Sequence, residues 1–120
     1  MLSLMTDVTV FEKPTCTTCR KLFKLLTEHG VDADRIDYQV LGLTRAQLDE
    51  IVHKTGLSPR QLLRTKEPEY KQLGLNNQSV SDEEILQAMV THPALLERPV
   101  VIRGDRAVLA RPAEKALELF

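Results

Sequence analysis

The chain has 120 residues, of which 42% are hydrophobic and 28% charged, and its formal net charge is −1. This size and composition predict one globular domain over residues 1–120 with a real core. A charge near zero gives no electrostatic case for nucleic acid or an anionic membrane as the main partner. No apolar run approaches the roughly 20 residues that span a bilayer, and residues 1–5 lack the basic start of a signal peptide. We therefore expect a cytoplasmic protein.

The first third of the chain has the pattern of a strand–helix–strand unit. Residues 6–12 are rich in β-forming side chains, and apolar residues then recur at helical spacing over 17–29. Residues 34–40 alternate and predict a second strand, with Tyr38 and Val40 on one face. A crossover of this kind joins parallel strands.

The middle of the chain, 42–95, is predicted to form a helical insert. Capping boxes at 44–47 and 81–84 each precede apolar residues at helical spacing, so each is expected to begin a helix. Shorter helical segments are expected near 58–64 and 67–74.

The chain then returns to strand. Residues 99–102 and 107–109 are predicted strands joined by a turn at Gly104 and Asp105, and a final helix is predicted over 112–119. The complete order is β-α-β, helical insert, β-β-α. It predicts an α/β fold with a mixed sheet, because the crossover joins parallel strands and the hairpin joins antiparallel ones.

The only two cysteines, Cys16 and Cys19, lie where the first strand gives way to the first helix. Cys16 falls at or just before the helix N-terminus, where backbone N–H groups and the helix dipole stabilise a thiolate, the reactive form. One alternative is half of a zinc site, but His29, His53 and His92 are scattered and supply no second pair of ligands. The other is a pair of inert core cysteines, for which the neighbouring polar residues are a poor setting. A redox role is favoured over both.

Five segments together resemble the arsenate-reductase-like (ArsC/Spx/YffB) family of thioredoxin-fold proteins. They cover nearly the whole chain in the order that the family has them: KPTCTTCR at 13–20, LLR at 62–64, YKQLGL at 70–75, HPALLERP at 92–99 and RPAE at 111–114. Each segment alone is a weak signal, whereas the ordered set is strong evidence of family. The resemblance implies a cis peptide bond before Pro99. It also implies a thioredoxin-like fold, which a C-x-x-C after the first strand of this topology indicates as well.

The resemblance also implies a set of site residues. In the glutaredoxin-linked arsenate reductases of this family, one cysteine attacks arsenate and three arginines hold the oxyanion. Matched motif by motif, these residues are Cys16 and Arg64, Arg98 and Arg111. Guanidinium groups suit a tetrahedral dianion because they donate paired, charge-assisted hydrogen bonds to its oxygens. Five other arginines are expected to be simply solvated: Arg35, Arg45, Arg60, Arg103 and Arg106.

Two positions depart from the pattern of those reductases. They usually have serine where this chain has Cys19, which suggests that Cys19 attacks Cys16 and releases product as an internal disulfide. They also carry a thiol-supporting histidine where this chain has Glu12. A nearby carboxylate is expected to raise the pKa of Cys16.

The leading hypothesis from the sequence is a cytoplasmic thiol-dependent arsenate reductase with no bound cofactor or metal. Glutathione is its expected co-substrate, and glutaredoxin or thioredoxin its expected reductant. One alternative is a glutathione-dependent thiol reductase of the same family without arsenate activity. The other is a redox-sensing regulator like Spx, which binds RNA polymerase and uses C-x-x-C as a switch. The Arg111-Pro112 pair favours the enzyme, because Spx-type chains lack it, whereas Cys19 favours the regulator.

Overall fold

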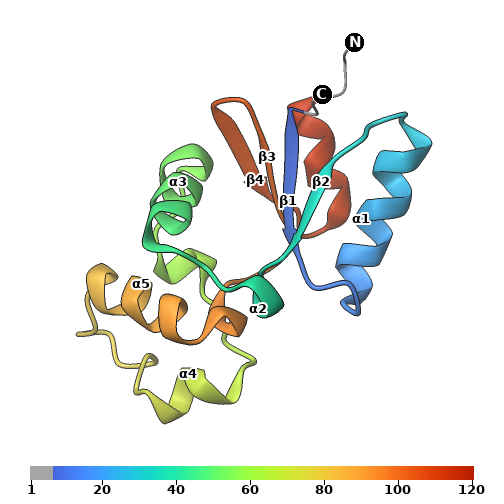
Figure 1. Ribbon diagram of the computed structural model, residues 1–120. Helices are drawn as coiled ribbons and strands as arrows, with labels where there is room; N and C mark the ends of the chain where they lie inside the picture. Colours follow the sequence, from blue (N-terminus) through green and yellow to red (C-terminus); the bar gives the residue numbers. More distant parts are fainter. Residues whose placement is uncertain (1–6) are drawn as a thin grey trace.

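The computed structural model describes residues 7–120 and contains a mixed sheet with helices on both faces (Figure 1). The predicted strand residue Thr6 and the segment 1–5 lie outside the described residues. Within residues 7–120 the sheet has the order β2-β1-β3-β4. β1 pairs parallel with β2 and antiparallel with β3, and β3 pairs antiparallel with β4, so the mixed sheet is confirmed. The strands are β1 (Val8–Glu12), β2 (Asp34–Asp37), β3 (Val100–Arg103) and β4 (Arg106–Leu109).

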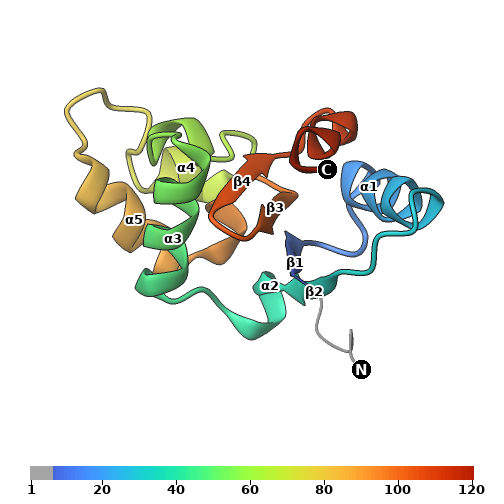
Figure 2. The same cartoon turned by 90° about the horizontal axis from the view of Figure 1, so that it is seen from above.

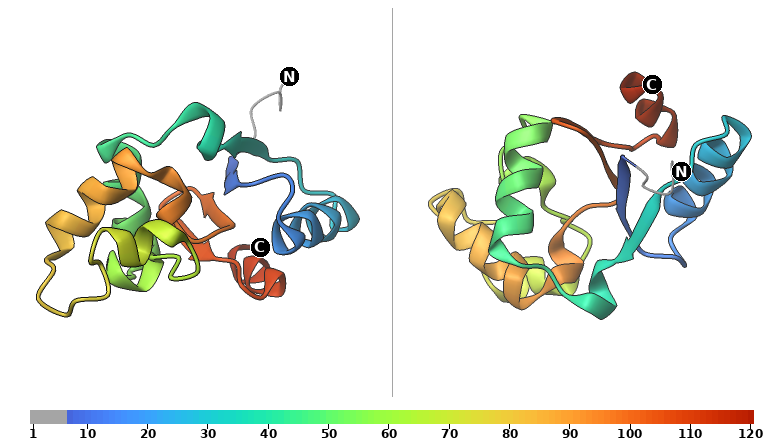
Figure 3. Two further views of the ribbon diagram at one scale, coloured as in Figure 1. Left: turned by 90° about the horizontal axis from the view of Figure 1, so that it is seen from below. Right: turned by 45° about the horizontal axis from the view of Figure 1, so that its top comes forward.

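The helices form two layers, one on each side of this sheet (Figure 2). α1 and the C-terminal helix η3 run side by side on one face (Figures 2 and 3). The helices between β2 and β3 in the chain cover the other face. The α-helices are α1 (Thr17–Glu28), α2 (Tyr38–Leu41), α3 (Arg45–Thr55), α4 (Pro68–Gln72) and α5 (Asp82–Thr91), and the 3₁₀ helices are η1 (Arg60–Leu62), η2 (Pro93–Leu95) and η3 (Ala113–Leu119).

Each face of the sheet buries its own hydrophobic core. Successive strand residues point to opposite faces, so Val8 and Val10 of β1 pack toward α1 while Phe11 packs toward the helical insert. The core on the α1 face is completed by Leu22, Leu26, Val101, Ala110, Ala113, Ala116 and Leu119. The larger core under the insert includes Leu48, Ile51, Leu62, Ile85, Met89, Leu95, Leu96 and Val100.

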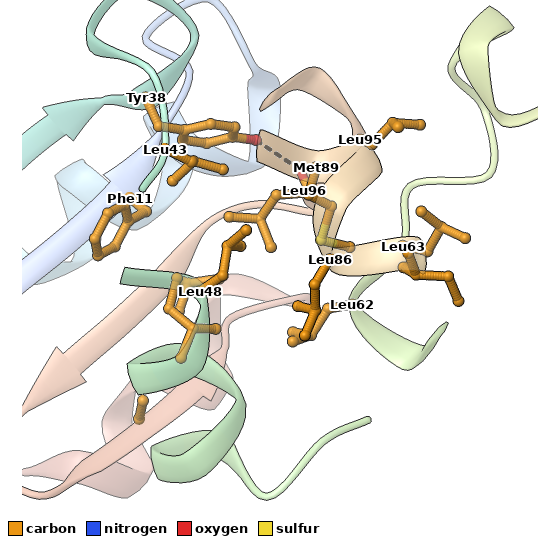
Figure 4. Close-up of a cluster of buried hydrophobic side chains, with 14 of the residues drawn as sticks. Phe11, Tyr38, Leu43, Leu48, Leu62, Leu63, Leu86, Met89, Leu95 and Leu96 are labelled. Atoms are coloured by element: carbon orange, nitrogen blue, oxygen red, sulfur yellow. Dashed lines mark hydrogen bonds between the residues drawn. The ribbon is translucent and has the colours of Figure 1, made fainter. Parts of the chain in front are cut away.

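The strand predicted over 34–40 is shorter than expected. β2 ends at Asp37, and the chain turns into α2, so Val40 is 78% exposed instead of sharing a buried face with Tyr38. The fully buried Tyr38 donates a hydrogen bond from its hydroxyl to the carbonyl oxygen of Leu96 at 2.6 Å (Figure 4). This long-range contact draws the ring under the insert and overrides the local alternation.

Most other local signals predicted the elements well. Both capping boxes are present, with Thr44 and Ser81 as the N-cap residues of α3 and α5. The hairpin turns at Gly104, whose φ of +62° is one that a residue with a side chain rarely adopts. The final helix begins at Ala113 instead of residue 112 and is 3₁₀ in character, with Pro112 as its N-cap residue.

The five arginines expected to be simply solvated all have partners, although Arg35 and Arg106 remain exposed. Arg60 donates to the carbonyl oxygens of Leu75 and Asn77 at 3.0 and 3.2 Å, which fastens the loop after α4. The other four also have partners: Arg35 binds Glu12, Arg45 binds Asp49 and Glu83, Arg103 binds Asp7 and the Leu119 carbonyl, and Arg106 binds the Glu118 carbonyl.

Replacing Tyr38 by phenylalanine tests the contact between α2 and the segment before β3. We expect Tyr38→Phe to lower the free energy of unfolding by about 1–2 kcal/mol, because the buried carbonyl of Leu96 loses its donor. Urea unfolding followed by circular dichroism measures the change. Tyr70→Phe is the matched control, because the hydroxyl of Tyr70 has no hydrogen-bond partner within residues 7–120. Equal stability of the two variants would contradict the assignment.

Candidate active site

Cys16 lies at the junction of β1 and α1, as the sequence predicts. It is the N-cap residue of α1, with extended backbone angles (φ −74°, ψ 130°). Its N–H donates to the carbonyl oxygen of Lys13 at 2.9 Å, and its own carbonyl oxygen accepts the first helical hydrogen bond, from Arg20, at 2.9 Å. The tight turn therefore places the sulfur where the first N–H groups of α1 converge.

The surroundings of the Cys16 sulfur lower its pKa. Burial by itself would raise the pKa, but hydrogen bonds to the sulfur outweigh it and bring the pKa to about 7. They come from the backbone N–H and thiol of Cys19, the guanidinium of Arg98 and the backbone N–H of Thr18. A large fraction of Cys16 is therefore thiolate at neutral pH, the form that acts as a nucleophile.

Cys19 has the opposite character. Its side chain is fully buried in the first turn of α1, and the two cysteines are not joined in a disulfide. Burial, followed by the nearby charges of Cys16 and Glu12, raises the pKa of Cys19 to about 12. In this structure Cys19 is thus a protonated donor to Cys16 and not itself a nucleophile.

The three arginines named by the resemblance gather beside Cys16. Arg64, Arg98 and Arg111 line a cavity of about 330 Å³ together with Cys16. The remaining lining residues are Lys13, Thr15, Thr17 and Thr18. Cys19 is not among them and lies beneath Cys16. Apart from the Cys16 thiolate, the charged side chains that line the cavity within residues 7–120 are cationic, so the cavity attracts anions.

Backbone pairing between distant segments sets the positions of these arginines. An isolated bridge joins Leu63 to Leu96, and the N–H of Arg64 donates to the Leu95 carbonyl at 2.7 Å. Arg64 and Arg98 are therefore held on neighbouring segments although 34 positions separate them in the chain. The Arg98–Pro99 peptide bond is cis, as the resemblance predicts.

Arg98 is the most deeply buried of the three arginines. The residue is 4% exposed, and its Nε and Nη1 atoms are buried without a hydrogen-bond partner among residues 7–120. Within the same residues, Nε of Arg64 is also buried without one. Buried donors of this kind are costly unless something accepts from them. With Lys13 and Arg111 on the same cavity wall, these two arginines make the cavity electropositive, which favours an anion.

Glu97 is a site residue that the sequence analysis did not single out. One of its oxygens accepts a hydrogen bond from Arg64 Nη1 at 2.7 Å and one from the N–H of Arg98 at 3.2 Å. The same oxygen lies 3.8 Å from Arg111 Nη1. The only signal in the sequence is an acidic residue directly before the expected Arg98.

Glu12 does not act on Cys16 as expected. Its carboxylate is 3% exposed and forms an ion pair with Arg35, with Arg35 Nε 2.8 Å from Glu12 Oε2. The guanidinium of Arg35 also lies over the Phe23 ring, 4.0 Å from its centre. The pKa of Cys16 is lowered, whereas the charge of Glu12 contributes to the raised pKa of Cys19. The expected rise in the pKa of Cys16 is therefore wrong.

The fold and the site together define a class of protein: a thioredoxin-like thiol oxidoreductase with a reactive cysteine at the start of its first helix. The model of the ArsC family matches residues 11–119. The chain belongs to the ArsC family. This confirms the family resemblance seen in the sequence.

Individual relatives agree over nearly their whole length. The chain is 37% identical over 111 residues to an arsenate reductase of Neisseria meningitidis serogroup A, covering 92% of this chain and 95% of that protein. It is 36% identical over 115 residues to an arsenate reductase of Haemophilus influenzae, covering 95% and 99%. A solved structure of an arsenate reductase from Vibrio cholerae matches with a TM-score of 0.90 at 32% identity, covering 94% of this chain and 97% of that one. The thioredoxin-like fold is thereby confirmed.

No helix within residues 7–120 is both long enough and apolar enough to cross a membrane.

The pH dependence of Cys16 alkylation tests the electrostatics of the site. Because the pKa is lowered to about 7, the rate of reaction with iodoacetamide should rise through a midpoint near pH 7 and level off above it. Arg98→Ala removes one of the stabilising hydrogen bonds, so its midpoint should move to higher pH. Arg106→Ala, which lies on β4, should keep the wild-type midpoint. A wild-type midpoint at the ordinary cysteine value of about 8.5 would contradict the assignment.

Proposed function

We propose that the protein is a thiol-dependent arsenate reductase with Cys16 as its nucleophile. The observation that carries the proposal is the lowered pKa of a thiol that opens into a cavity lined by Arg64, Arg98 and Arg111. Two relatives that match over nearly their whole length bear the name arsenate reductase, which supports the same substrate. The proposed location is cytoplasmic, where thiols are kept reduced.

The cavity suits the binding of arsenate. Arsenate is a tetrahedral oxyanion that carries one or two negative charges near neutral pH, and the three guanidinium groups approach from three separate segments of the chain. Guanidinium groups donate paired, charge-assisted hydrogen bonds to oxygens of this kind. The N–H groups at the start of α1 add to the positive field beside Cys16.

In the first step, the Cys16 thiolate attacks arsenic and a sulfur–arsenic bond forms. One arsenate oxygen leaves as water after protonation, so arsenic remains pentavalent in the adduct. The arginines offset the negative charge on the oxygens as the anionic sulfur approaches the oxyanion. The positive charge of the site therefore stabilises the transition state.

In the second step, a thiol attacks the Cys16 sulfur. A sulfur–sulfur bond forms, the sulfur–arsenic bond breaks, and its electron pair stays on arsenic, which leaves as trivalent arsenite. The attacking thiol is Cys19 or that of glutathione as co-substrate. The resulting disulfide or mixed disulfide is then reduced by thioredoxin or glutaredoxin, which closes the cycle.

The cavity favours the enzyme over the redox-sensing regulator. A C-x-x-C redox switch that binds RNA polymerase has no use for three arginines gathered at its cysteine, whereas a reductase of an oxyanion needs them. A thiol reductase of the same family without arsenate activity would use Cys16 in the same way. Arsenate turnover separates it from the proposed enzyme.

Arsenate-dependent oxidation of NADPH by the purified protein tests the proposal. The assay is run once with glutathione, glutaredoxin and glutathione reductase, and once with thioredoxin and its reductase. We expect turnover in at least one of the two systems and none with Cys16→Ser, because that variant has no thiolate. Arg106→Ala serves as a control and should turn over like the wild type. Absence of turnover in both systems, with Cys16 shown to be reduced and reactive, would refute arsenate as the substrate.

The role of Cys19 is tested by Cys19→Ala in the same two systems. If Cys19 resolves the adduct, the variant should lose turnover with thioredoxin, because no internal disulfide can form. Turnover with glutathione and glutaredoxin should persist, because glutathione then supplies the second thiol. Wild-type rates with thioredoxin would show that Cys19 is not the resolving residue.

A further inference from the structure

We propose that Glu97 is a positioning residue, which holds the guanidinium groups of Arg64 and Arg111 ready for the oxyanion. The inference rests on the proposed function and adds to it a residue that does not itself touch the substrate. Its basis is the shared Oε1 atom, 2.7 Å from Arg64 Nη1 and 3.8 Å from Arg111 Nη1.

Glu97 lies behind the arginines and not between them and the cavity. The side chain is 19% exposed, and Glu97 is not among the residues of 7–120 that line the cavity, although Arg64 and Arg111 are. A guanidinium carries five N–H donors, so a contact at one nitrogen leaves others for a ligand. In the described part of the chain, Nε of Arg64 makes no hydrogen bond but lies 3.7 Å from Glu67 Oε2, a second carboxylate beside this guanidinium.

The backbone also takes part in this arrangement. The N–H of Arg98 donates to Glu97 Oε1 at 3.2 Å, and Arg111 Nη1 donates to the Arg98 carbonyl oxygen at 3.0 Å. The carboxylate thus connects three segments that carry the arginines: the loop after η1, the segment before β3 and the segment after β4. The Arg98 side chain is not held by Glu97 and instead interacts with the Tyr38 hydroxyl and the Cys16 sulfur. Glu97 therefore holds Arg64 and Arg111, whereas Arg98 stabilises the Cys16 thiolate.

Two physical effects make such a tether useful. Long side chains lose considerable rotational freedom when a ligand fixes them, and a side chain already held in place loses less. Like charges on adjacent guanidinium groups also repel, and a carboxylate between them offsets the repulsion. The carboxylate has a cost as well, since its negative charge repels a bound anion.

Neutral substitutions of Glu97 distinguish the effect of its hydrogen bonds from the effect of its negative charge on anion binding. Glu97→Gln keeps an acceptor oxygen at nearly the same place, whereas Glu97→Met has a similar length and shape but no comparable acceptor. Both remove the same charge, so the effect of charge on anion binding is common to the two. Any difference between them reports the hydrogen bonds to the arginines.

Protection of Cys16 from iodoacetamide by inorganic phosphate, and in parallel by arsenate, measures anion binding without turnover. We expect the dissociation constant to be about tenfold higher in Glu97→Met than in Glu97→Gln, because only the glutamine variant keeps the arginines in place. The pH midpoint of alkylation should be the same in both variants. Equal dissociation constants, or tighter binding by Glu97→Met, would overturn the proposal.

A double-mutant cycle shows whether the effect passes through the arginine. In an Arg64→Ala background, the difference between Glu97→Met and Glu97→Gln should shrink to less than about threefold, because the closest donor is gone. A full tenfold difference in that background would overturn the proposal. Glu83→Gln and Glu83→Met are the matched controls, since Glu83 binds the remote Arg45 and should give equal constants. Glu97→Ala serves as a second acceptor-free variant if Glu97→Met fails to fold.

Failure of this inference and failure of the proposed function give different results. If arsenate is not a substrate, turnover is absent in every variant, while the protection assay still reports anion binding and the glutamine–methionine difference. If Glu97 is not a positioning residue, the wild type turns over arsenate and the two variants bind anions alike.

Discussion

The structure depends on a buried cation beside a thiolate. Arg98 is 4% exposed, and burying a guanidinium is costly unless a negative charge or acceptors compensate. Cys16 supplies part of that compensation, and Arg98 in turn lowers the pKa of Cys16. Each group therefore stabilises the charged form of the other. Two nitrogens of Arg98 nevertheless have no acceptor among residues 7–120, so part of the cost of burying this cation is not offset by hydrogen bonds within them.

The topology brings Cys16 and Arg98 together although they lie far apart in the chain. Cys16 follows β1, and Arg98 precedes β3, which pairs directly with β1 in the centre of the sheet. The helical insert adds the third segment, because its loop carrying Arg64 bridges to the strand-like segment at Leu96. The hairpin of β3 and β4 returns the chain so that Arg111 lies next to the carbonyl of Arg98. Helices and loops far from the cysteine thus determine the shape of its cavity.

The sequence predicts the parts of the site that rest on local signals or on family motifs. The residues around Cys16 indicate the start of a helix. The family motifs predict Arg98 as a site residue without reference to the fold. It does not predict the contacts made across the fold. Glu97 reaches Arg64 from 33 positions away, and Tyr38 leaves its predicted strand for a carbonyl 58 positions away. The proximity of Glu12 to Cys16 along the chain suggests an effect on the pKa of Cys16, whereas the ion pair of Glu12 with Arg35 depends on the pairing of β1 with β2.

The unequal cysteines constrain any mechanism for this site. With pKa values of about 7 for Cys16 and about 12 for Cys19, only Cys16 can begin a reaction near neutral pH. The burial of Cys19 and its hydrogen bond to Cys16 favour its protonated form as long as Cys16 is a thiolate. Once Cys16 forms a covalent adduct, its negative charge is lost, and one cause of the raised pKa of Cys19 disappears with it. On the proposed mechanism, the first step therefore prepares the second: Cys19 becomes easier to ionise only after there is an adduct for it to attack.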